Sequence, residues 1–316
     1  MNIAMVGSGA AGSVFACYLK KGGAELTLVD RYRAHMEKCA AEGLRFVTPA
    51  GEELLRGFRT AASAGELGVM DIVILMVKAT QTEALIPELR ACVGPETAIV
   101  SLQNGLGNDE LLSRFFDPGH ILYGFGTIGT ELPEPGKCVS RPESGVIMRF
   151  GAVADGPVSR RAGEYLEACF RRGGCEAVFE EDIRPFVWKK AISNSGYNTL
   201  SALLRLKVGD MLADENALAL LRSVWDEGCA VCRAMTGLDL RPELREELPR
   251  LREGFAEYYP SMAQDLLRHR RQTEISLLNG AIVRFGRLCG MPTPVNEALC
   301  QMVSCIQANY EKQYGA

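Results

Sequence analysis

The feature that most constrains the fold of this chain is a glycine motif close to its start. Residues 2–6 form a short apolar run that is typical of a buried strand, and this run leads directly into GSGAAG at residues 7–12. Residues 13–21 then follow a helical period, and residues 25–29 form a second apolar run. Gly-x-Gly-x-x-Gly between the strand and the helix of a βαβ unit is the fingerprint of a Rossmann-type dinucleotide site. The sequence therefore predicts an α/β fold that binds a dinucleotide.

Each residue of the motif has a separate physical task. Gly7 allows the tight turn, Gly9 lets the backbone approach the pyrophosphate, and Gly12 lets the helix pack closely on the strand. Ala10 and Ala11 begin the helix, whose free N–H groups and positive dipole end favour phosphate. We therefore expect Gly7, Gly9, Ala10, Ala11 and Gly12 to hold the cofactor.

The residues after the second predicted strand carry conflicting information about the cofactor. Asp30 stands 18 residues after Gly12, where an acid typically holds the ribose 2′-hydroxyl of NAD. Arg31 and Arg33 follow, and an arginine there can instead hold the 2′-phosphate of NADP. The alternative for both arginines is exposed loop charge.

Length and charge narrow the function classes. The 316 residues suit two domains, and the net charge of −4 gives no reason to expect nucleic acid or an anionic membrane as a partner. No uncharged apolar stretch reaches the ~20 residues of a membrane span, and the start lacks the basic residues of a signal peptide. We therefore expect a cytoplasmic protein without a membrane partner.

Cysteine and histidine usage limits the chemistry. The 11 cysteines have no repeating spacing and are expected to be reduced thiols, and the one Cys-x-x-Cys pair, Cys229 and Cys232, has no second pair to complete a zinc site. We expect no metal. The chain has 3 histidines, so the acid–base group is sought among lysines and carboxylates.

Polar residues follow two further predicted strands of the first half. Residues 71–77 and 97–102 are apolar throughout, as in buried parallel strands, and they are followed by Lys78 and by Gln103-Asn104-Gly105. Ligands of open α/β sheets lie beyond the carboxyl ends of the strands, so Lys78 and Asn104 are expected to face cofactor or substrate. A loop lysine and an ordinary Asn-Gly turn are the alternative.

The sequence pattern changes in the remainder of the first half. Residues 121–150 lose the helical period and predict antiparallel strands that extend the sheet, residues 157–172 predict a helix, and residues 176–179 a last strand. The acidic residues 180–182 mark a change, which predicts a dinucleotide-binding domain over 1–182 and a helical substrate and dimerisation domain over 183–316.

The helical half carries an unusual polar stripe. Lys190, Asn194 and Asn198 are spaced four apart in the helical segment 186–206, so they share one face. A solvated face is the alternative, but such faces usually carry Glu, Lys and Arg, and asparagine is a poor helix former. The spacing therefore favours a functional stripe.

A second segment of this half contains Ser261 and Glu274. Ser261 with Gln264 fits a capping box, so a helix N-cap is an equally good interpretation of Ser261. Glu274 stands among apolar residues, where a buried carboxylate would need a partner such as a lysine.

Taken together, the chain resembles the 2-dehydropantoate 2-reductase (ketopantoate reductase) family over its whole length. The motifs that carry the resemblance are GSGAAG at 7–12, VKATQT at 77–82, QNG at 103–105, WKKAISNSGYN at 188–198, PSMAQD at 260–265 and TEISLLNG at 273–280. The resemblance implies a Rossmann-type domain followed by an all-helical domain, and reduction of a small 2-oxo acid with NADPH, namely 2-dehydropantoate to pantoate in pantothenate and coenzyme A biosynthesis.

The resemblance also implies roles for individual residues. Lys190 would be the catalytic lysine, and Glu274 would orient it or contact the substrate hydroxyl and the cofactor. Asn194, Asn198 and Ser261 would bind substrate, with Ser261 at its carboxylate. Lys78 and Asn104 would line the nicotinamide end, and Arg31 would meet the 2′-phosphate of NADP, while Asp30 leaves NAD as an alternative cofactor.

Two departures from the family pattern leave alternatives open. Ser261 and Glu274 are 13 apart, one more than is usual, and we place the additional residue within 268–272; Ser276 stands where an aspartate is usual. These departures bear on the substrate. The alternatives are a β-hydroxyacid-type dehydrogenase of another small acid and a non-catalytic NAD(P)-sensing regulatory protein, and a homodimer stays a hypothesis.

Overall fold

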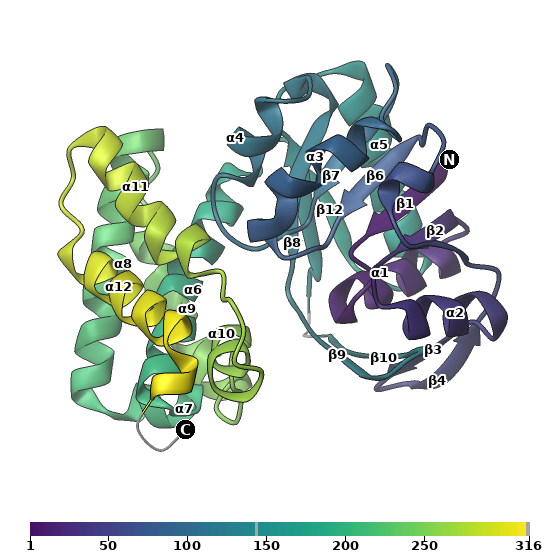
Figure 1. Ribbon diagram of the computed structural model, residues 1–316. Helices are drawn as coiled ribbons and strands as arrows, with labels where there is room; N and C mark the ends of the chain where they lie inside the picture. The colour runs from purple at the N-terminus through teal and green to yellow at the C-terminus, as the bar shows by residue number, and fades with distance from the viewer. Residues whose placement is uncertain (143–144, 314–316) are drawn as a thin grey trace. The chain divides into compact units, whose positions relative to one another are not determined.

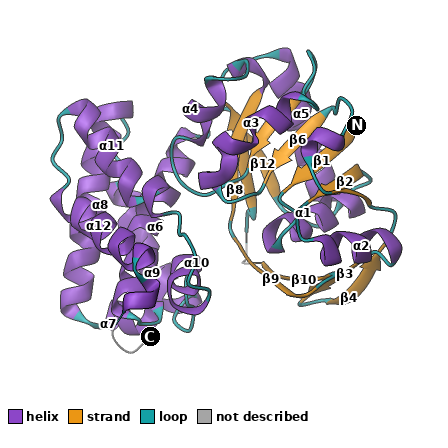
Figure 2. Cartoon of the chain, in the orientation of Figure 1, coloured by secondary structure: helices purple, strands orange, loops and turns teal. Residues whose placement is uncertain are grey.

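The computed structural model describes residues 1–142 and 145–313, and it divides them into two compact units. The first, the α/β unit, comprises Met1–Gln103 and Asn108–Ile183. The second, the helical unit, comprises Asn104–Gly107 and the described residues from Arg184 onward. In the described part of the chain, all strands lie in the α/β unit (Figure 2).

The α/β unit is built on an eight-stranded sheet with the order β12-β11-β8-β7-β6-β1-β2-β5. All neighbouring strands are parallel except β8 and β11. The chain moves from β1 to β2 on one side and returns to β6 on the other, so the order reverses beside β1, where open α/β sheets bind their ligands. The strands are β1 (Asn2–Val6), β2 (Glu25–Val29), β5 (Arg59–Ala61), β6 (Ile72–Leu75), β7 (Ala98–Ser101), β8 (Ile121–Gly126), β11 (Met148–Ala152) and β12 (Ala177–Glu180).

Alternate side chains of the central strands enter two different hydrophobic cores. On β1, Ile3 and Met5 pack in the core that includes α1 (Ala10–Lys21) and α5 (Pro157–Arg172). Ala4 and Val6 pack in the core that includes α3 (Thr82–Arg90) and α4 (Asn108–Ser113). Helices on both faces explain why these strands are apolar throughout rather than alternating. Figure 1 shows these helices beside the sheet.

Two strands of the 121–150 segment do not extend the main sheet, so this part of the prediction was wrong. They form a separate four-stranded sheet of order β4-β3-β10-β9, whose Phe46 and Cys138 join the core around α1. Tyr18 of α1 also bonds to Ser140, with 2.9 Å between their hydroxyl oxygens. The second sheet therefore covers α1 on the side away from the main sheet. Its strands are β3 (Leu44–Thr48), β4 (Gly51–Leu55), β9 (Ile128–Glu134) and β10 (Lys137–Pro142).

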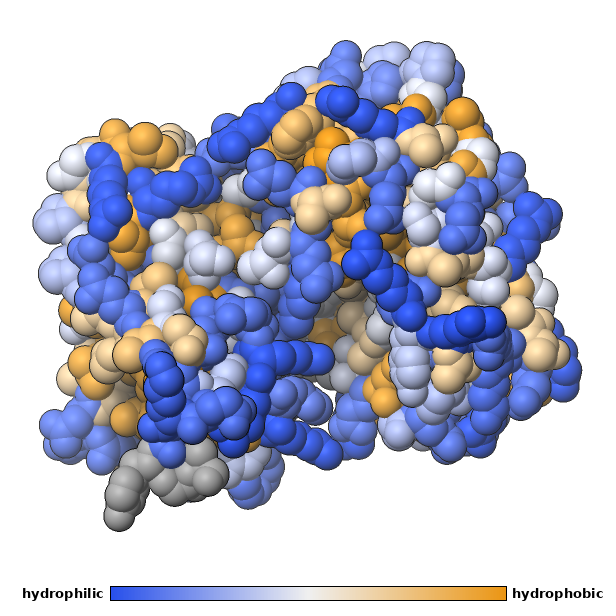
Figure 3. All heavy atoms as spheres, in the orientation of Figure 1, coloured by the Kyte–Doolittle hydropathy of each residue, from blue (hydrophilic) through white to orange (hydrophobic). Residues whose placement is uncertain are grey.

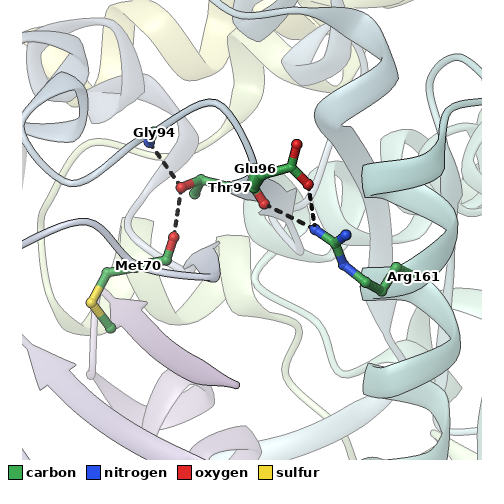
Figure 4. Close-up of polar contacts among 5 residues, drawn as sticks. All are labelled: Met70, Gly94, Glu96, Thr97 and Arg161. Carbon is green, nitrogen blue, oxygen red and sulfur yellow. Dashed lines mark hydrogen bonds and ion pairs between the residues drawn. The ribbon is translucent and has the colours of Figure 1, made fainter.

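Side-chain bonds fix the start of β7 (Figure 4). The hydroxyl of Thr97 donates to the carbonyl oxygen of Met70 at 2.5 Å and accepts from the N–H of Gly94 at 2.8 Å. Next to it, Glu96 pairs with Arg161 of α5 at 3.0 Å. The remaining helices of the unit are α2 (Arg33–Ala41) and the 3₁₀ turns η1 (Ala64–Glu66), η2 (Ala79–Gln81) and η3 (Pro118–His120).

The helical unit is held by a buried polar network as well as by apolar packing. Asn279 donates to the carbonyl oxygen of Ser195 and to Oδ1 of Asn296, both at 3.0 Å, and accepts from Thr199 at 2.7 Å. The helices of the unit are α6 (Arg184–Leu204), α7 (Val208–Ala213), α8 (Glu215–Thr236), α9 (Arg241–Gly254), α10 (Ser261–Ala263), the π-helical turn η4 (Gln264–Arg268), η5 (Ile275–Leu277), α11 (Asn279–Cys289), α12 (Pro294–Ala308) and η6 (Tyr310–Lys312).

None of the described helices combines the length and apolar character needed to cross a membrane. On the face shown in Figure 3, hydrophobic residues are interspersed with hydrophilic ones on both units.

Candidate active site

The glycine turn brings three backbone segments together at the point where the strand order reverses. A Cβ on Gly7, which has φ +97°, would lie 2.3 Å from the nitrogen of Val77, and a Cβ on Gly12 would lie 2.1 Å from the oxygen of Gly7. The N–H of Gly7 also donates to the carbonyl oxygen of Val29 at 2.8 Å. The ends of β1, β2 and β6 are thus fixed side by side, with no space for side chains at Gly7 or Gly12.

Gly9 differs from its two neighbours because nothing in the protein requires a glycine there. A Cβ on Gly9 would meet no atom within 4 Å, and its φ of −70° is open to any residue. Gly9 is also the N-cap of α1, without a side-chain cap. Open space over the uncapped N–H groups of a helix is what a pyrophosphate requires. The turn that includes Ala10 and Ala11 therefore fits the dinucleotide that the motif predicts.

The two residues expected to discriminate between cofactors are held differently. One carboxylate oxygen of Asp30 accepts from the N–H of Tyr32 at 2.9 Å, so this acid is fixed at the end of β2. The side chain of Arg31 is 81% exposed and pairs with Glu88 at 3.2 Å. Arg33 pairs with Glu37 on the surface of α2. Asp30 is therefore held by the backbone, whereas both arginines are held by exposed ion pairs.

Lys78 follows β6 directly beside the glycine turn, because its neighbour Val77 is the residue that Gly7 approaches. Its loop is held by Gln103, which sequence reasoning did not single out. Nε2 of Gln103 donates to the carbonyl oxygen of Val77 and to the hydroxyl of Thr82, each at 2.9 Å. The buried glutamine of the QNG motif is thus a support for the Lys78 loop.

Asn104 follows β7, yet the turn that it begins belongs to the helical unit. Gly105 has φ +97°, and a Cβ there would lie 2.6 Å from Leu277. The N–H of Leu106 donates to the carbonyl oxygen of Leu277 at 2.9 Å. Since Leu277 is three residues after Glu274, the structure brings the Asn104 turn and the Glu274 segment together.

The polar stripe of α6 is not a solvated face. Asn194 and Asn198 are 6% and 4% exposed, and Lys190 is half-buried. Asn194 accepts a hydrogen bond from the hydroxyl of Tyr197 at 2.7 Å. The amide of Asn198 makes no hydrogen bond within residues 1–142 and 145–313. No atom of this amide is both fully enclosed and unpartnered, so the amide is accessible to a ligand.

The two adjacent lysines of α6 have different surroundings. Lys189 pairs with Glu247 of α9, with 2.9 Å between Nζ and Oε2, and this carboxylate is 12% exposed. Lys189 therefore joins two helices. Lys190 lies one residue further round the helix, on the face of the buried asparagines.

The N-cap interpretation of Ser261 was wrong. Pro260 is the N-cap of α10, Ser261 is the first helical residue, and no side-chain cap is formed. Instead, Met262 accepts a hydrogen bond from Thr199 at 3.5 Å, which ties the start of α10 to α6 one residue after Asn198. The start of α10, which includes Ser261, therefore lies beside α6.

The π-helical turn η4 ends at Arg268, the first residue of the stretch in which we placed the additional residue. The N–H of His269 donates to the carbonyl oxygen of Gln264 at 2.9 Å, an i to i+5 bond. Such turns are the usual way in which a helix accommodates one more residue, and they are frequent at functional sites.

Glu274 is half-buried rather than enclosed, and no ion pair to it is formed within the described residues. Its segment is nevertheless fixed, because Asn279 follows η5 and bonds to α6. Asn296, a partner of Asn279, also donates to Glu227 of α8 at 2.7 Å. The roles of the buried Asn279 and Asn296 were not predicted, since an asparagine's partners in a distant helix leave no trace in local sequence.

Two surface hollows and the Cys229–Cys232 pair of the helical unit do not include any of the predicted site residues. A hollow of about 630 Å³ beside α7 and a second of about 370 Å³ between α8 and α9 contain none of them, so pocket size does not locate this site. Burial raises the pKa of the Cys229 thiol to about 12 and also raises that of Cys232, which disfavours the thiolates that a metal needs.

Comparison with known proteins identifies relatives over both units. The family model "Ketopantoate reductase PanE/ApbA" matches residues 3–153, and "Ketopantoate reductase PanE/ApbA C terminal" matches residues 182–307. The 2-dehydropantoate 2-reductase of Pyrococcus horikoshii is 30% identical over 304 residues, which cover 96% of each chain.

Two solved structures share the fold over almost the whole chain. The 2-dehydropantoate 2-reductase of Geobacter metallireducens is 26% identical with a TM-score of 0.87, and the alignment covers 96% of this chain and 99% of that one. D-mandelate dehydrogenase, in a ternary structure with NADH and anilino(oxo)acetate, is 26% identical with a TM-score of 0.88, covering 99% and 100%.

The geometry of Gly9 generates a prediction. We expect Gly9→Ala to leave the free energy of unfolding within about 0.5 kcal/mol of the original, because the new Cβ meets no protein atom. The same methyl group should weaken dinucleotide binding about tenfold or more, since it occupies the space of the pyrophosphate. Calorimetric titration with NADP⁺ and denaturant unfolding measure the two effects.

Gly68→Ala is the matched control, because a Cβ there also meets nothing within 4 Å. It should change neither quantity. A Gly9→Ala variant that binds NADP⁺ as tightly as the original protein would contradict the assignment of this turn.

Proposed function

Because this chain belongs to the ketopantoate reductase family, we propose that it reduces 2-dehydropantoate to pantoate with NADPH. As a member of that family it is an NAD(P)-dependent oxidoreductase of 2-oxo acids. One observation supports this assignment for the chain: Asn194 and Asn198, which are 6% and 4% exposed, share a face of α6 with the half-buried Lys190. This activity would place the chain in pantothenate and coenzyme A biosynthesis.

The proposed mechanism assigns charge stabilisation to the chain. A reduced nicotinamide, when bound, supplies the hydride. Negative charge then develops on the 2-oxo oxygen of the substrate, where Lys190 as an ammonium would stabilise it and donate a proton. Glu274 would orient the ammonium and contact the cofactor. Lys190 is suited to this role because it shares the face of α6 with Asn194 and Asn198.

The remaining predicted residues would bind the two ligands. Asn194, Asn198 and Ser261 would hold the substrate, with Ser261 at the carboxylate. Gly7, Gly9, Ala10, Ala11 and Gly12 would hold the pyrophosphate, and Lys78 and Asn104 would line the nicotinamide end. Asp30 and Arg31 would compete for the adenosine ribose, so we propose NADP as the preferred cofactor with NAD accepted.

A second candidate function is reduction of a bulkier 2-oxo acid. It is supported by the likeness to D-mandelate dehydrogenase, whose TM-score of 0.88 is close to the 0.87 of the Geobacter reductase at the same 26% identity. It is also supported by the π-helical turn that follows the proposed carboxylate contact, Ser261. A cytoplasmic location, suggested by 11 unpaired cysteines, and a homodimer remain proposals.

The substrate is tested with a panel of 2-oxo acids. We expect NADPH oxidation to be fastest, by kcat/KM, with 2-dehydropantoate among 2-dehydropantoate, 3-methyl-2-oxobutanoate and phenylglyoxylate. Preference for phenylglyoxylate would favour the second candidate. A protein that binds NADPH but turns over none of the three would instead support a sensing role.

The catalytic lysine is tested with its neighbour as control. We expect Lys190→Ala to lower kcat by ~10²–10⁴, the usual loss for an acid–base group, while NADP⁺ binding is kept. Lys189→Ala breaks the pair with Glu247 and should reduce stability without a comparable loss of kcat. Steady-state kinetics of both variants measure these effects. If Lys190→Ala kept more than about a tenth of the original kcat, Lys190 would not be the proton donor.

Cofactor preference is tested by removing one charge at a time. Asp30→Asn keeps an oxygen for the N–H of Tyr32 but loses the charge, so it should shift the ratio of kcat/KM values toward NADPH. Arg31→Ala should shift it toward NADH. We expect about fivefold in each case, because an exposed charge pair contributes up to ~1 kcal/mol.

Arg33→Ala is the control for loop charge in general and should leave the ratio unchanged. An unchanged ratio in Asp30→Asn would mean that Asp30 does not contact the ribose. A shift in Arg33→Ala but not in Arg31→Ala would move the phosphate contact to Arg33.

A further inference from the structure

The α/β unit contains a fully buried histidine that the proposed chemistry does not use. His35 lies on α2 and is 0% exposed. Its Nδ1 is 2.9 Å from the backbone nitrogen of Gly136, in the turn between β9 and β10, and its Nε2 is 3.0 Å from the hydroxyl of Ser13 on α1. His35 thus joins the second sheet to the helix that the glycine motif opens.

The direction of these hydrogen bonds determines the state of the ring. A backbone N–H can only donate, so Nδ1 accepts from Gly136 and carries no proton. The proton of the neutral ring is then on Nε2, which donates to the hydroxyl of Ser13. That hydroxyl in turn donates to the carbonyl oxygen of Ser8 at 2.9 Å, and Ser8 donates through its own hydroxyl to Met5 at 2.9 Å.

These hydrogen bonds reach the glycine motif at Ser8. Ser8 lies between Gly7 and Gly9, and Ser13 follows Gly12, so the bond from Ser13 to Ser8 closes the loop that contains Gly9. Ser8 and Ser13 are both 0% exposed. Water therefore does not substitute readily for the bond that His35 donates, and loss of that bond leaves buried polar groups unpaired.

The surroundings of the ring favour its neutral form. Burial lowers the pKa of His35 from its ordinary value of 6.5, although the charge of Asp30 and the backbone of Ser8 oppose the shift. On α2, Cys39 lies 3.7 Å from the ring, and its own pKa is raised to about 12 by burial, so it faces the imidazole as a neutral thiol. Tyr32 stacks on the ring at 6.0 Å between centroids. A proton on Nδ1 would face the N–H of Gly136, donor against donor.

We propose that His35 is a positioning residue for the dinucleotide: the neutral ring holds the Ser8–Ser13 loop in its binding conformation. A proton on Nδ1 repels the N–H of Gly136 and displaces the ring from Ser13, which releases the loop and weakens binding. The proposal rests on the proposed function only in taking this loop as the dinucleotide site. His35 itself contacts neither cofactor nor substrate in this scheme.

The sign of the pH dependence follows from the lowered pKa. The unfolded chain takes up a proton at His35 near pH 6.5, and the folded chain does so only at lower pH. The stabilisation due to neutral His35 is therefore complete above about pH 6.5 and declines as the pH falls below it. Dinucleotide affinity should be constant at neutral pH and decline as the pH falls through the folded-state pKa.

The test measures the Kd of NADP⁺ by calorimetric titration between pH 5 and 8, together with the thermal unfolding midpoint of the unliganded protein. The 2′-phosphate of NADP⁺ titrates near pH 6 for every variant alike, so the contribution of His35 is the difference between profiles. His35→Gln keeps one acceptor and one donor without titrating. His35→Phe keeps the ring volume without either, and Ser13→Ala interrupts the link to the loop.

For the original protein we expect Kd to rise by about threefold or more relative to His35→Gln as the pH falls from 7 to 5, with a limit of about tenfold per pH unit for one linked proton. His35→Gln should bind normally at pH 7.5, and His35→Phe about tenfold more weakly. Ser13→Ala should lose the excess pH dependence of binding and keep that of unfolding. The KM of the 2-oxo acid should change little in these variants.

The control is the double variant His120→Gln/His269→Gln, in which His35 is the remaining histidine and the original profile should persist. Parallel profiles for the original protein and His35→Gln would overturn the inference while leaving the reductase assignment intact. Normal pH-dependent binding without turnover of any 2-oxo acid would overturn the assignment and keep the inference. Absence of NADP⁺ binding at every pH would overturn both.

Discussion

The α/β unit depends on the close approach of two backbone segments at the glycine turn. Because Gly12 lies against Gly7, and Gly7 against Val77, helix α1 can begin only where the ends of β1 and β6 meet. This one constraint places an uncapped helix N-terminus beside Asp30 on one side and Lys78 on the other. The anion site is therefore a consequence of backbone packing, and the surrounding side chains only decide which dinucleotide it prefers.

The helical unit reaches the same kind of preorganisation by a different route. Hydrogen bonds of buried amides, rather than close contacts of glycines, fix how each helix is turned about its own axis. Asn279 bonds to α6 and to Asn296, which bonds to Glu227 of α8. A fully satisfied network of this kind fixes one arrangement, because any rotation of α6 would leave buried groups unpaired. The face that carries Asn194 and Asn198 is thereby presented as a ready-made polar surface.

Local sequence patterns predicted what local forces determine. The helix at residues 157–172 coincides with α5, and the glycine motif identified the fold, because period, proline and glycine act over a few residues. The strands β9 and β10 were assigned to the wrong sheet, since β10 pairs with β3, about 90 residues earlier, and periodicity does not specify a partner. The same reason hid Gln103, Asn279 and the role of His35: each is defined by partners distant in sequence.

In both units, the residues that fix the structure differ from the residues proposed to contact the ligands. The groups that fix the geometry, His35, Gln103 and Asn279, are buried and bond to protein. The groups proposed to contact substrate, such as Ser261 and Asn198, make no side-chain bond to the described protein, so they can be exchanged without loss of the scaffold. A protein named D-mandelate dehydrogenase and one named 2-dehydropantoate 2-reductase both share this fold, so fold similarity alone does not select a substrate. We propose that substrate choice lies in the few residues around Ser261 and the π-helical turn, where this chain departs from the family pattern.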